Sequence, residues 1–444
     1  MGLIVQKYGG TSVANLERTQ NVANRVVQTY QKGHDVVVIV SAMAGVTDSL
    51  IGLARKINES PDKRELDALM ATGEQTTASL LAMMLKSMGY PAQSLMGFQV
   101  EVLTDFCYGN ARIQDIRINR VRNLLANRTI VVVAGFQGCD PEGNITTLGR
   151  GGSDTSAVAI AAALKADSCE IYTDVTGVFT ADPNVVPKAR KLDKLSYEEM
   201  LEMASIGAKV LQIRSVEFAM KYNVPVHVRS SFSDEEGTMV VAEENGMERV
   251  VVSAVTMNKT DARITLRKVP DMPGIAAKIF TPIAEAGICV DMIIQNTRAS
   301  GKTDLTFTVP KADFKTALEI EKKVAKTIEA EDVFGDENIA KVSITGVGMR
   351  SHPGVAARMF TTLAREGINI LMISTSEIRI SCLIEQKYAE LAVQSLHTEF
   401  GLDTPYNKGV KGPRGPVTFH SGFHLTPRPL EPLTPSSHHA PFQS

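Results

Sequence analysis

The sequence contains no tryptophan, and aromatic residues make up only 5% of its 444 residues. Flat side chains that could stack on single-stranded nucleic-acid bases are therefore scarce. The 47 Lys and Arg residues face 49 Asp and Glu residues, for a formal net charge of −2, so no basic surplus exists to attract a polyanion. No run of about 20 apolar residues occurs, which is the length that a membrane-spanning helix needs. We expect neither nucleic acid nor a membrane as a partner.

The cysteines show no close pairing along the sequence. Cys107, Cys139, Cys169, Cys289 and Cys382 lie far apart, and no C-x-x-C pair occurs. This spacing favours reduced thiols in a cytoplasmic protein over a disulfide framework or a zinc site. We predict a cytoplasmic location and no metal ion held by the protein itself.

Several common catalytic motifs are missing as well. The absence of G-x-x-x-x-G-K-[ST], H-R-D and D-F-G excludes P-loop and protein-kinase chemistry. The dinucleotide motif G-x-G-x-x-G fails at residues 149–154, because Asp154 stands where the third glycine is required. The sequence also lacks the G-x-S-x-G turn that carries the nucleophile of many hydrolases. Phosphoryl transfer remains, since it needs positioning and charge neutralisation and no covalent nucleophile.

In the first 230 residues, short β-branched runs alternate with helical patterns. Buried parallel strands give continuous apolar runs, and the helices that connect them cover both faces of the sheet. We predict an α/β sandwich with a mostly parallel sheet. The predicted strands are 3–6, 35–41, 129–135, 170–173 and 224–228, and the predicted helices are 15–31, 66–88 (as one or two helices) and 156–164.

An internal repeat follows residue 250. Residues 273–294 match residues 353–374, which lie 80 positions later, at 11 of 22 places. Each copy reads strand, Pro-Gly turn, helix, Gly, strand, strand, helix, which predicts two βαββαβ units that each end in a further strand. The elements predicted in the first copy are 263–268, 275–285, 288–294, 303–309 and 314–328, and those in the second are 341–346, 355–365, 368–373, 378–384 and 389–400.

Two glycine-rich segments follow predicted strands. In the first, two consecutive glycines lie just after Lys7, and such a turn can present backbone N–H groups to an anion. In the second, residues 147–156, three glycines surround Arg150, and Asp154 lies at the start of an Ala-rich helix. Arg150 suits a two-pronged contact with a carboxylate or phosphate. The alternatives are a plain tight turn and a helix N-cap, but together the two segments favour an anion-binding site.

These segments belong to a set of seven motifs that resembles the aspartate kinases of the amino-acid kinase family. The motifs are KYGGTSV at 7–13, VSAMAGVTD at 40–48, TGEQ at 72–75, AGFQG at 134–138, TLGRGGSDTSA at 147–157, YTDVTGVFTADP at 172–183 and ASIGAKVL at 204–211. The repeated units resemble the tandem ACT domains that these enzymes carry. The resemblance implies the amino-acid kinase fold followed by two ferredoxin-like ACT domains.

The resemblance also implies a reaction. ATP would phosphorylate the β-carboxylate of L-aspartate to 4-phospho-L-aspartate, the first step of lysine, threonine and methionine biosynthesis through diaminopimelate, with Mg²⁺ held mainly by the ATP phosphates. The catalytic residues that it implies are Lys7, Arg150, Asp154 and Lys209. The implied substrate contacts are Ser41, Thr47, Glu74, Arg150 and Ser153, and the implied nucleotide contacts are Lys7, Gly9, Gly10, Thr173, Asp174, Phe179, Asp182 and Lys209.

The implied roles agree with the chemistry of aspartate. Lys7 would neutralise charge on the transferring phosphoryl group, Arg150 would clamp a carboxylate and Glu74 would receive the ammonium group. The attacking carboxylate is already ionised at neutral pH, so the site needs no general base. Taken alone, Glu74 could be a solvated helix residue, Thr47 a helix cap and Lys209 an exposed helical lysine.

The ACT resemblance implies feedback inhibition by lysine, threonine or both, and the alternative is that the repeats only mediate dimerisation. The resemblance allows a homo-oligomer or an α2β2 assembly whose shorter subunit starts near Met247. The effector positions that it implies are Asp271, Val290, Asp291 and Gln295 in the first copy and Val355, Ala356, Asn369, Ile370 and Ser376 in the second.

Composition and repeats together set the expected domain boundaries. We predict a kinase domain at 1–245, ACT domains at 246–338 and 339–403, and a disordered tail at 404–444. Eight of the 19 prolines fall in this last segment, which cannot bury enough apolar surface to offset the entropy of ordering.

Two positions depart from the family pattern. Phe179 stands where the family usually has an aromatic hydroxyl, and Asn184 stands where it usually has Arg. Loss of a hydrogen bond and of a positive charge near the nucleotide predicts weaker ATP binding.

Two other functions are disfavoured by the same residues. A kinase acting on glutamate, acetylglutamate or UMP would not need the repeat or the set of Ser41, Thr47 and Glu74. A non-catalytic amino-acid sensor would not need to keep Lys7, Arg150 and Asp154, and all three are present.

Overall fold

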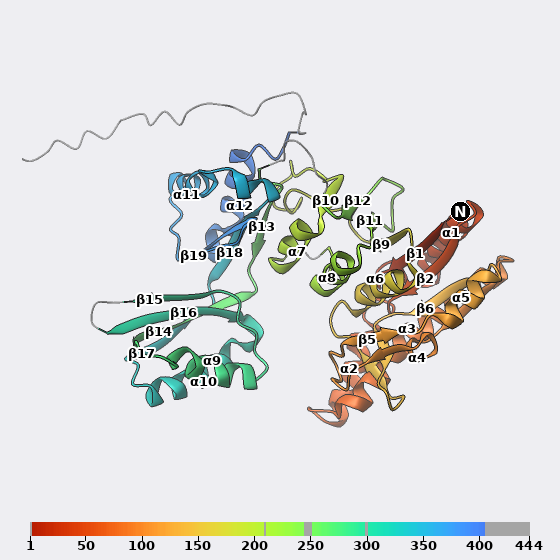
Figure 1. Ribbon diagram of the computed structural model, residues 1–444, viewed down its shortest axis with the longest axis horizontal. Coiled ribbons are helices and arrows are strands. Elements are labelled where there is room, and N and C mark those ends of the chain that lie inside the picture. The colour runs from red at the N-terminus through yellow and green to blue at the C-terminus, as the bar shows by residue number, and fades with distance from the viewer. Residues whose placement is uncertain (1, 208–209, 244–250, 298–300, 405–444) are drawn as a thin grey trace, which may run out of the picture. The chain divides into compact units, whose positions relative to one another are not determined.

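The computed structural model describes residues 2–207, 210–243, 251–297 and 301–404. Figure 1 colours the chain from its N-terminus onward and labels its helices and strands. The predicted site residue Lys209, the position Met247, the boundary at 245 and the predicted tail from 405 lie outside the described residues.

Among the described residues, eight strands form one large sheet in the order β10-β12-β11-β9-β1-β2-β6-β3. β11 and β12 are antiparallel, and the other neighbouring strands are parallel. The predicted mostly parallel sheet is therefore confirmed. Its strands are β1 (Leu3–Tyr8), β2 (Asp35–Val40), β3 (Ala92–Leu95), β6 (Ile130–Ala134), β9 (Ser168–Thr173), β10 (Lys194–Ser196), β11 (Val226–Ser230) and β12 (Thr238–Val241).

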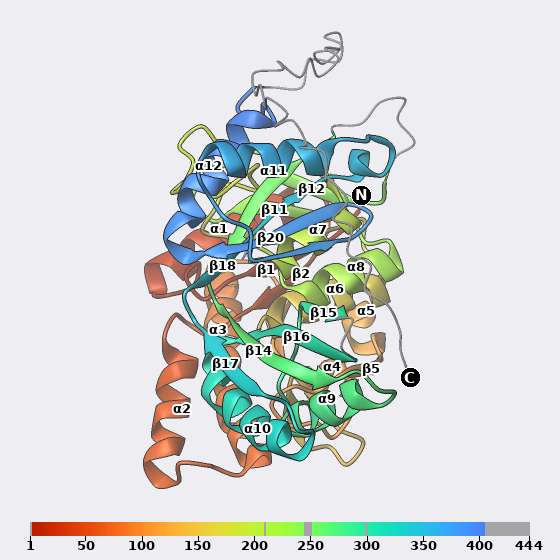
Figure 2. The same ribbon diagram turned by 90° about the vertical axis from the view of Figure 1, so that its left-hand side faces the viewer.

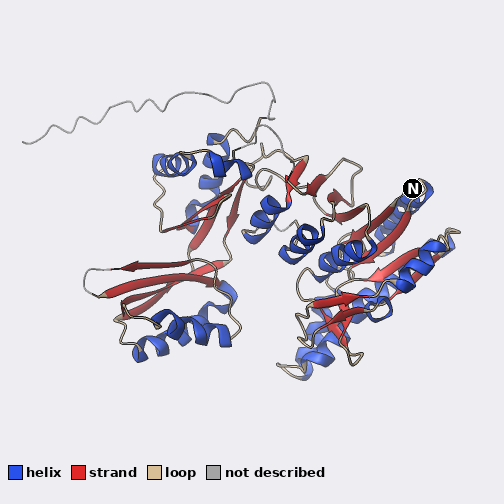
Figure 3. Ribbon diagram, viewed as in Figure 1, coloured by secondary structure: helices blue, strands red, loops and turns tan. Residues whose placement is uncertain are grey.

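Helices cover both faces of this sheet, as Figure 3 shows in blue around the red strands. Side chains of β2 alternate between the two faces: Val36 and Val38 join one hydrophobic core, and Val37 and Ile39 join the other. α1 (Leu16–Gln31) and α3 (Lys63–Ser87) pack on the first face, and α5 (Asn119–Ala126), α6 (Gly152–Leu164), α7 (Tyr197–Ser205) and α8 (Ile213–Tyr222) pack on the second. The continuous apolar run that follows Asp35 in β2 is explained by this burial on both sides.

A smaller sheet with the order β5-β4-β7-β8 lies beside the main one in the first part of the chain. Two short helices, α2 and α4, precede its strands in the sequence. The bounds are α2 (Val46–Ile57), α4 (Gly97–Val100), β4 (Val102–Thr104), β5 (Ile113–Ile116), β7 (Gln137–Cys139) and β8 (Ile145–Thr147).

The two repeats form two further sheets, each with a pair of helices. The first sheet has the order β15-β16-β14-β17, and its helices α9 and α10 lie side by side on one face (Figures 1 and 2). Its elements are β14 (Asp261–Pro270), α9 (Ile275–Glu285), β15 (Ile293–Thr297), β16 (Lys302–Pro310), α10 (Phe314–Thr327) and β17 (Asp332–Asp336). The second repeat has β18 (Ile339–Thr345), α11 (Val355–Arg365), β19 (Met372–Thr375), β20 (Arg379–Glu385) and α12 (Ala389–Glu399).

The second repeat takes its fourth strand from an unexpected place. β13 (Ala254–Asn258) precedes the first repeat in the sequence, yet it pairs antiparallel with β18. Among the described residues no strand follows α12, so the closing strand expected there is wrong. Ala254 and Val255 are fully buried in this position, which supplies the apolar edge that the sequence after α12 lacks. The first repeat is therefore inserted between β13 and the rest of the second.

Two predicted strands begin later than expected. Residues 288–294 and 368–373 were predicted as strands, but β15 begins at Ile293 and β19 at Met372. Ile288 and Ile368 instead donate their backbone N–H groups to Ile283 and Leu363 in the preceding helices. They follow glycines with positive φ and pack back on the helix ends, as apolar residues at that position commonly do.

None of the helices described here is long and apolar enough to span a membrane.

Candidate active site

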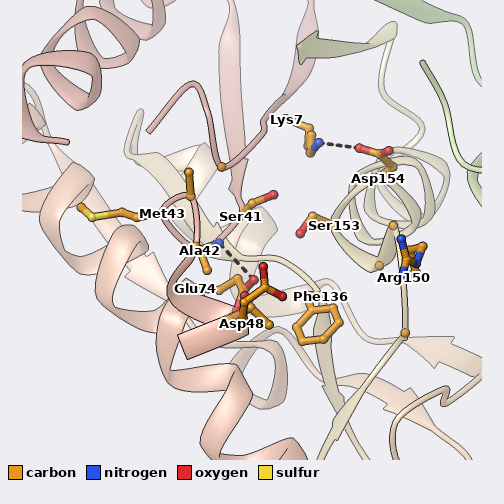
Figure 4. Close-up of a pocket in the computed structure, with 17 residues that line it drawn as sticks. Lys7, Ser41, Ala42, Met43, Asp48, Glu74, Phe136, Arg150, Ser153 and Asp154 are labelled. Atoms are coloured by element: carbon orange, nitrogen blue, oxygen red, sulfur yellow. Dashed lines mark hydrogen bonds and ion pairs between the residues drawn. The ribbon is translucent and has the colours of Figure 1, made fainter. Parts of the chain in front are cut away.

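The two glycine-rich segments meet at the carboxyl edge of the large sheet, where ligands of parallel α/β sheets usually bind. They line a cavity of about 300 Å³. The lining comes from the turn after β1 (Lys7 and Gly10), the loop after β2 (residues 41–48), Glu74 of α3, Phe136 after β6, and the turn into α6 (residues 149–154). Figure 4 shows this cavity with its main side chains.

Lys7 and Asp154 form an ion pair on one side of the cavity (Figure 4). Lys7 Nζ lies 2.6 Å from Asp154 Oδ1, and the two side chains are only 12% and 10% exposed. Asp154 occupies the first turn of α6, where the helix dipole also favours an anion. Since Asp154 holds the lysine in place, the ammonium group is fixed at the cavity wall before any ligand binds.

Glycine is required where the first turn approaches the neighbouring loop. A Cβ atom on Gly10 would lie 2.8 Å from the carbonyl oxygen of Ala42, closer than side chains tolerate. Gly9 leaves more room, because a Cβ there would stand 3.5 Å from Lys7 Nζ. Gly10 lines the cavity with Lys7, so this turn brings backbone as well as charge to the site.

The turn into α6 is fixed from outside the cavity by Asp67, which sequence reasoning missed. This fully buried carboxylate accepts hydrogen bonds from the N–H of Thr147 (2.7 Å), the hydroxyl of Thr147 (2.8 Å) and the N–H of Gly109 (2.9 Å). Burial raises the pKa of Asp67, and the three hydrogen bonds oppose that rise. Asp67 is therefore a positioning residue for the strand that leads to Arg150.

The helix α6 begins at Gly152, four residues before the predicted start at Ser156. Gly151 has φ +70° and precedes the helix, and a Cβ there would overlap the side chain of Gln212 at 1.8 Å. Only glycine fits this position without displacing Gln212. The earlier start places Ser153 and Asp154 in the first helical turn, facing the cavity.

Glu74 is buried on the other side of the cavity, with 3% of its surface exposed. Its Oε1 accepts a hydrogen bond from the N–H of Ala42 at 3.0 Å, while Oε2 has no hydrogen-bond partner in the described part of the chain. Burial raises the pKa of Glu74 to about 7, although hydrogen bonds from backbone N–H groups oppose this. A buried carboxylate oxygen without a partner suits an incoming ammonium group.

Four further predicted substrate contacts lie around the same cavity. Ser41 follows β2, Thr47 is in the first turn of α2, Ser153 is in the first turn of α6, and Arg150 is exposed on the turn before it. In the view of Figure 4, Ser41 and Ser153 stand between the Lys7–Asp154 pair and Glu74. The cavity thus combines the ammonium group of Lys7, the hydroxyl groups of Ser41, Thr47 and Ser153, and Oε2 of Glu74, which has no partner among the described residues.

Asp48 and Phe136 also line the cavity, and sequence reasoning did not select them. Phe136 has φ +68°, a conformation that non-glycine residues seldom adopt. Its N–H donates to Ser156 Oγ at 3.1 Å, and its carbonyl accepts from the N–H of Leu148 at 2.8 Å. The motif AGFQG directly after a buried strand was the available signal for this residue.

The predicted nucleotide residues Thr173, Asp174, Phe179 and Asp182 do not line this cavity. They lie at and beyond the carboxyl end of β9, which pairs with β1 next to the Lys7 turn. Asp182 accepts hydrogen bonds from the backbone and side-chain nitrogens of Asn184 at 2.9 and 3.0 Å. The segment therefore leaves the same sheet edge as Lys7 but lies outside the cavity lining.

The predicted effector residues of the first repeat do not gather at one point. Asp271 donates its N–H to Gly301, Gln295 pairs with Leu305, and Asp291 donates its N–H to Thr308. Gly301 directly precedes β16 and Leu305 lies within it, so Asp271 and Gln295 are about 13 Å apart along the strand direction at 3.3 Å per residue. Asp291 forms an ion pair with buried Lys341 of the second repeat, and Val290 packs against the core of the first.

In the second repeat, the predicted effector residues lie at two turns. Val355 and Ala356 begin α11, and Val355 is buried in the hydrophobic core. Asn369 and Ile370 lie between α11 and β19. Ser376 follows β19 and donates its hydroxyl to Glu202 of α7 at 2.9 Å.

Comparison with known proteins agrees with this geometry. A model of the amino acid kinase family matches residues 2–230, and a model of the ACT domain matches residues 267–323 and 342–400. The chain is 57% identical to an aspartokinase of Pseudomonas aeruginosa over 411 residues, which are 92% of this chain and 100% of that protein. It is 51% identical to an aspartokinase of Geobacillus stearothermophilus over 402 residues, 90% of this chain and 98% of the other.

Solved structures give the same result. The chain is similar to Escherichia coli aspartokinase III crystallised with aspartate and ADP, with 27% identity and a TM-score of 0.74, over 89% of this chain and 99% of the other. The structure of that enzyme with lysine and aspartate gives a TM-score of 0.71 at 27% identity, over 90% and 99%. The fold and the site define a member of the amino acid kinase family with ACT domains. Within that family, the chain belongs to the aspartate kinases, which are phosphotransferases.

Proposed function

We propose that this aspartate kinase transfers the γ-phosphoryl group of ATP to the β-carboxylate of L-aspartate, and that the cavity of Figure 4 holds the aspartate. The observation that carries the proposal is the convergence of Lys7, Asp154, Arg150 and Glu74 on one cavity. Aspartate carries two carboxylates and one ammonium group. The cavity wall has cations for the carboxylates, and for the ammonium group it has Oε2 of Glu74, which has no hydrogen-bond partner among the described residues.

The substrate would be held by charges of opposite sign. Glu74 would bind the ammonium group and Arg150 the α-carboxylate, with hydroxyls of Ser41, Thr47 and Ser153 completing the contacts. Arg150 is exposed, so its guanidinium group can turn toward the ligand as it enters. This arrangement leaves the β-carboxylate directed toward Lys7.

Lys7 would stabilise the charge that spreads over the oxygens of the transferring phosphoryl group. Its ion pair with Asp154 orients the ammonium group in advance, so little reorganisation is needed during the reaction. The β-carboxylate attacks as an anion, and no proton is removed from it. Lys209 would add a second positive charge, and Thr173, Asp174, Phe179 and Asp182 would contact the nucleotide.

Besides Glu74, the cavity lining has the carboxylates of Asp48 and Asp154, which offer the oxygen ligands that Mg²⁺ prefers. We propose that the ion is held mainly by the ATP phosphates and water. When bound, Mg²⁺ neutralises negative charge on those phosphates.

The test is ATP- and aspartate-dependent formation of aspartyl hydroxamate by the purified protein. We expect product with aspartate and none above background with glutamate, acetylglutamate or UMP in the matched phosphorylation assays. Activity with one of those acceptors and not with aspartate contradicts the proposal.

We also propose that the enzyme serves lysine, threonine and methionine biosynthesis and that lysine, threonine or both inhibit it through the ACT repeats. An effector can shift the populations of two states only by binding one more tightly than the other. The E. coli relative was crystallised with lysine in a form called the T-state and with ADP in a form called the R-state. Assembly as a homo-oligomer or an α2β2 complex through the repeats belongs to the same proposal.

The effector proposal predicts the behaviour of two exposed residues of the first repeat, Asp271 and Gln295. Replacing either by Ala should raise the lysine and threonine concentrations needed for half-inhibition about tenfold, the effect of losing one charged or polar ligand contact. The uninhibited kcat should not change, because neither residue lines the cavity. Full inhibition of both variants at wild-type concentrations would mean that the effector pocket is elsewhere.

The departure from the family pattern at Asn184 predicts an effect on the affinity for ATP. Asn184 is exposed beside Asp182, so an arginine there would add one positive charge near the proposed nucleotide surface. We expect Asn184→Arg to lower KM for ATP about two- to fivefold, since exposed charge contacts contribute little. Replacement of exposed Asn127 by Arg, at the end of α5, serves as the control. An unchanged KM for ATP in both variants contradicts the hypothesis.

A further inference from the structure

The segment proposed to contact the nucleotide is packed against the second ACT repeat. Thr180 lies between Phe179 and Asp182 and is fully buried. Its Oγ1 is 2.9 Å from Nε2 of His397, a residue of α12 that is itself only 1% exposed. A hydrogen bond therefore joins the nucleotide segment to the last helix of the repeat, across 217 positions in the sequence.

Apolar and backbone contacts strengthen this junction. Ala181 and Val186 are buried in the hydrophobic core of the second repeat, together with Val393 and Leu396 of α12. The side-chain amide of Gln394, also in α12, donates to the carbonyl of Val185 at 2.8 Å. Ala181, Val185 and Val186 thus pack in or against the core of the second repeat, while Asp182 and Asn184 stay exposed.

The backbone around Thr180 is held on both sides. The N–H of Thr180 donates to the carbonyl of Arg190, and the N–H of Arg190 donates to Thr180 Oγ1; each bond is 2.9 Å long. Its carbonyl accepts from the N–H of Val255, in β13, at 2.8 Å. The backbone of Thr180 is therefore held by Arg190 and by Val255, and His397 supplies the side-chain contact.

A buried hydrogen-bonded pair within an apolar core fixes how the two segments that carry it are aligned. Apolar side chains tolerate small sliding movements with little loss of contact, whereas a buried hydrogen bond is lost when its partners shift. Burial lowers the pKa of His397, which favours the neutral imidazole in this pair. Phe179 and Asp182 lie one and two positions from Thr180, so the placement of Thr180 against α12 also fixes where these two residues lie.

We propose that His397 is a positioning residue for ATP binding: through Thr180 it fixes the segment that carries Phe179 and Asp182, so that the second ACT repeat completes the nucleotide site. This inference rests on the nucleotide role proposed for that segment. It gives the regulatory half of the chain a direct structural connection to ATP affinity. The aspartate cavity contains none of these residues.

The test compares three variants of the full-length protein: His397→Ala, His397→Gln and Leu363→Ala. Leu363 is fully buried in the same hydrophobic core, on α11, so its truncation destabilises the repeat without removing the bond to Thr180. The dissociation constant of Mg-ADP is measured by calorimetry, the KM values for ATP and aspartate by assay, and the melting temperature by scanning calorimetry.

We expect His397→Ala to weaken ADP binding and raise KM for ATP about tenfold, the effect of one buried hydrogen bond. KM for aspartate should stay at its wild-type value. His397→Gln, whose amide retains a hydrogen-bonding group, should recover most of the ADP affinity. Leu363→Ala should lower the melting temperature at least as much as His397→Ala and leave ADP affinity unchanged.

The outcomes separate this inference from the proposed function. If the enzyme phosphorylates aspartate and His397→Ala binds ADP as tightly as wild type, the positioning role alone is wrong. An equal loss of ADP affinity in Leu363→Ala also overturns it, because general destabilisation then explains the effect. If ADP binding weakens only in His397→Ala while no aspartate is phosphorylated, the positioning role stands and the proposed function fails. A wild-type protein that binds no ADP overturns both.

Discussion

Replacing Lys7 with Met is expected to lower kcat about a thousandfold, with a much smaller change in KM for aspartate. The ammonium group of Lys7 is held 2.6 Å from Asp154 at the wall of the cavity, where it would face charge that develops during phosphoryl transfer. Removing one preorganised group of this kind typically costs a factor of about 10²–10³ in kcat. Steady-state kinetics with saturating ATP measures the effect.

The loss of Lys7 also leaves Asp154 buried without its cation, so the variant should be less stable than wild type. The double variant Lys7→Met with Asp154→Asn removes both charges and provides the control. We expect it to regain most of the melting temperature but none of the activity. If activity returns together with stability, Lys7 holds the fold and has no part in catalysis.

The secondary structure was most predictable where local signals were redundant. The helices α9 and α11 span 275–285 and 355–365, as the repeat predicted. Each follows a Pro-Gly pair whose glycine has φ +86° or +91°, and each ends just before a second glycine with positive φ. Glycines on both sides of an amphipathic run fix both helix ends, so no tertiary information was needed.

The topology was less predictable because strand pairing is not local. β13 lies next to β18, although more than 80 positions separate them in the sequence. Its short run of apolar residues gives no information about which sheet edge it will join. The predicted domain boundaries placed residues 254–258 in the first ACT domain, at 246–338, but β13 forms its hydrogen bonds with β18 of the second repeat.

The candidate site shows the same division. The motifs indicated that Lys7, Arg150 and Asp154 would share one site, and the structure brings them to one cavity. Asp67 escaped notice because its three hydrogen-bond donors lie about 40 and 80 positions away. From the sequence alone, a carboxylate on a helix is expected to face solvent. Only the fold shows that Asp67 is buried.

Replacing Glu74 with Gln is expected to raise KM for aspartate about a hundredfold at pH 8, the cost of losing one partner of a buried charge pair. In wild type, burial raises the pKa of Glu74 to about 7, and only the ionised form can bind an ammonium group. KM for aspartate should therefore fall about tenfold between pH 6 and pH 8, as the binding-competent fraction rises. The glutamine variant has no such proton to lose, so its KM should not follow this dependence.

The same substitution is expected to stabilise the fold at high pH, although it weakens aspartate binding. The folded state binds the Glu74 proton more tightly than the unfolded state, with a pKa of about 7 against 4.5. The stability from this group is therefore complete below pH 4.5 and is lost as the pH rises through 7, by about 3 kcal/mol at most. Glu74→Gln should gain melting temperature relative to wild type at pH 8 and little at pH 5.

Glu321 supplies a matched control for both effects. It is fully buried in α10 of the first repeat, far from the cavity lining, and burial raises its pKa to about 8. Glu321→Gln should show the same direction of stability change at high pH while leaving KM for aspartate and its pH dependence untouched. If Glu74→Gln keeps the wild-type dependence of KM on pH, a different group receives the ammonium. The two variants together separate the cost of burying a carboxylate from the role of that carboxylate in binding aspartate. The charge on Glu74 destabilises the empty cavity, and the ammonium group of the bound substrate compensates it.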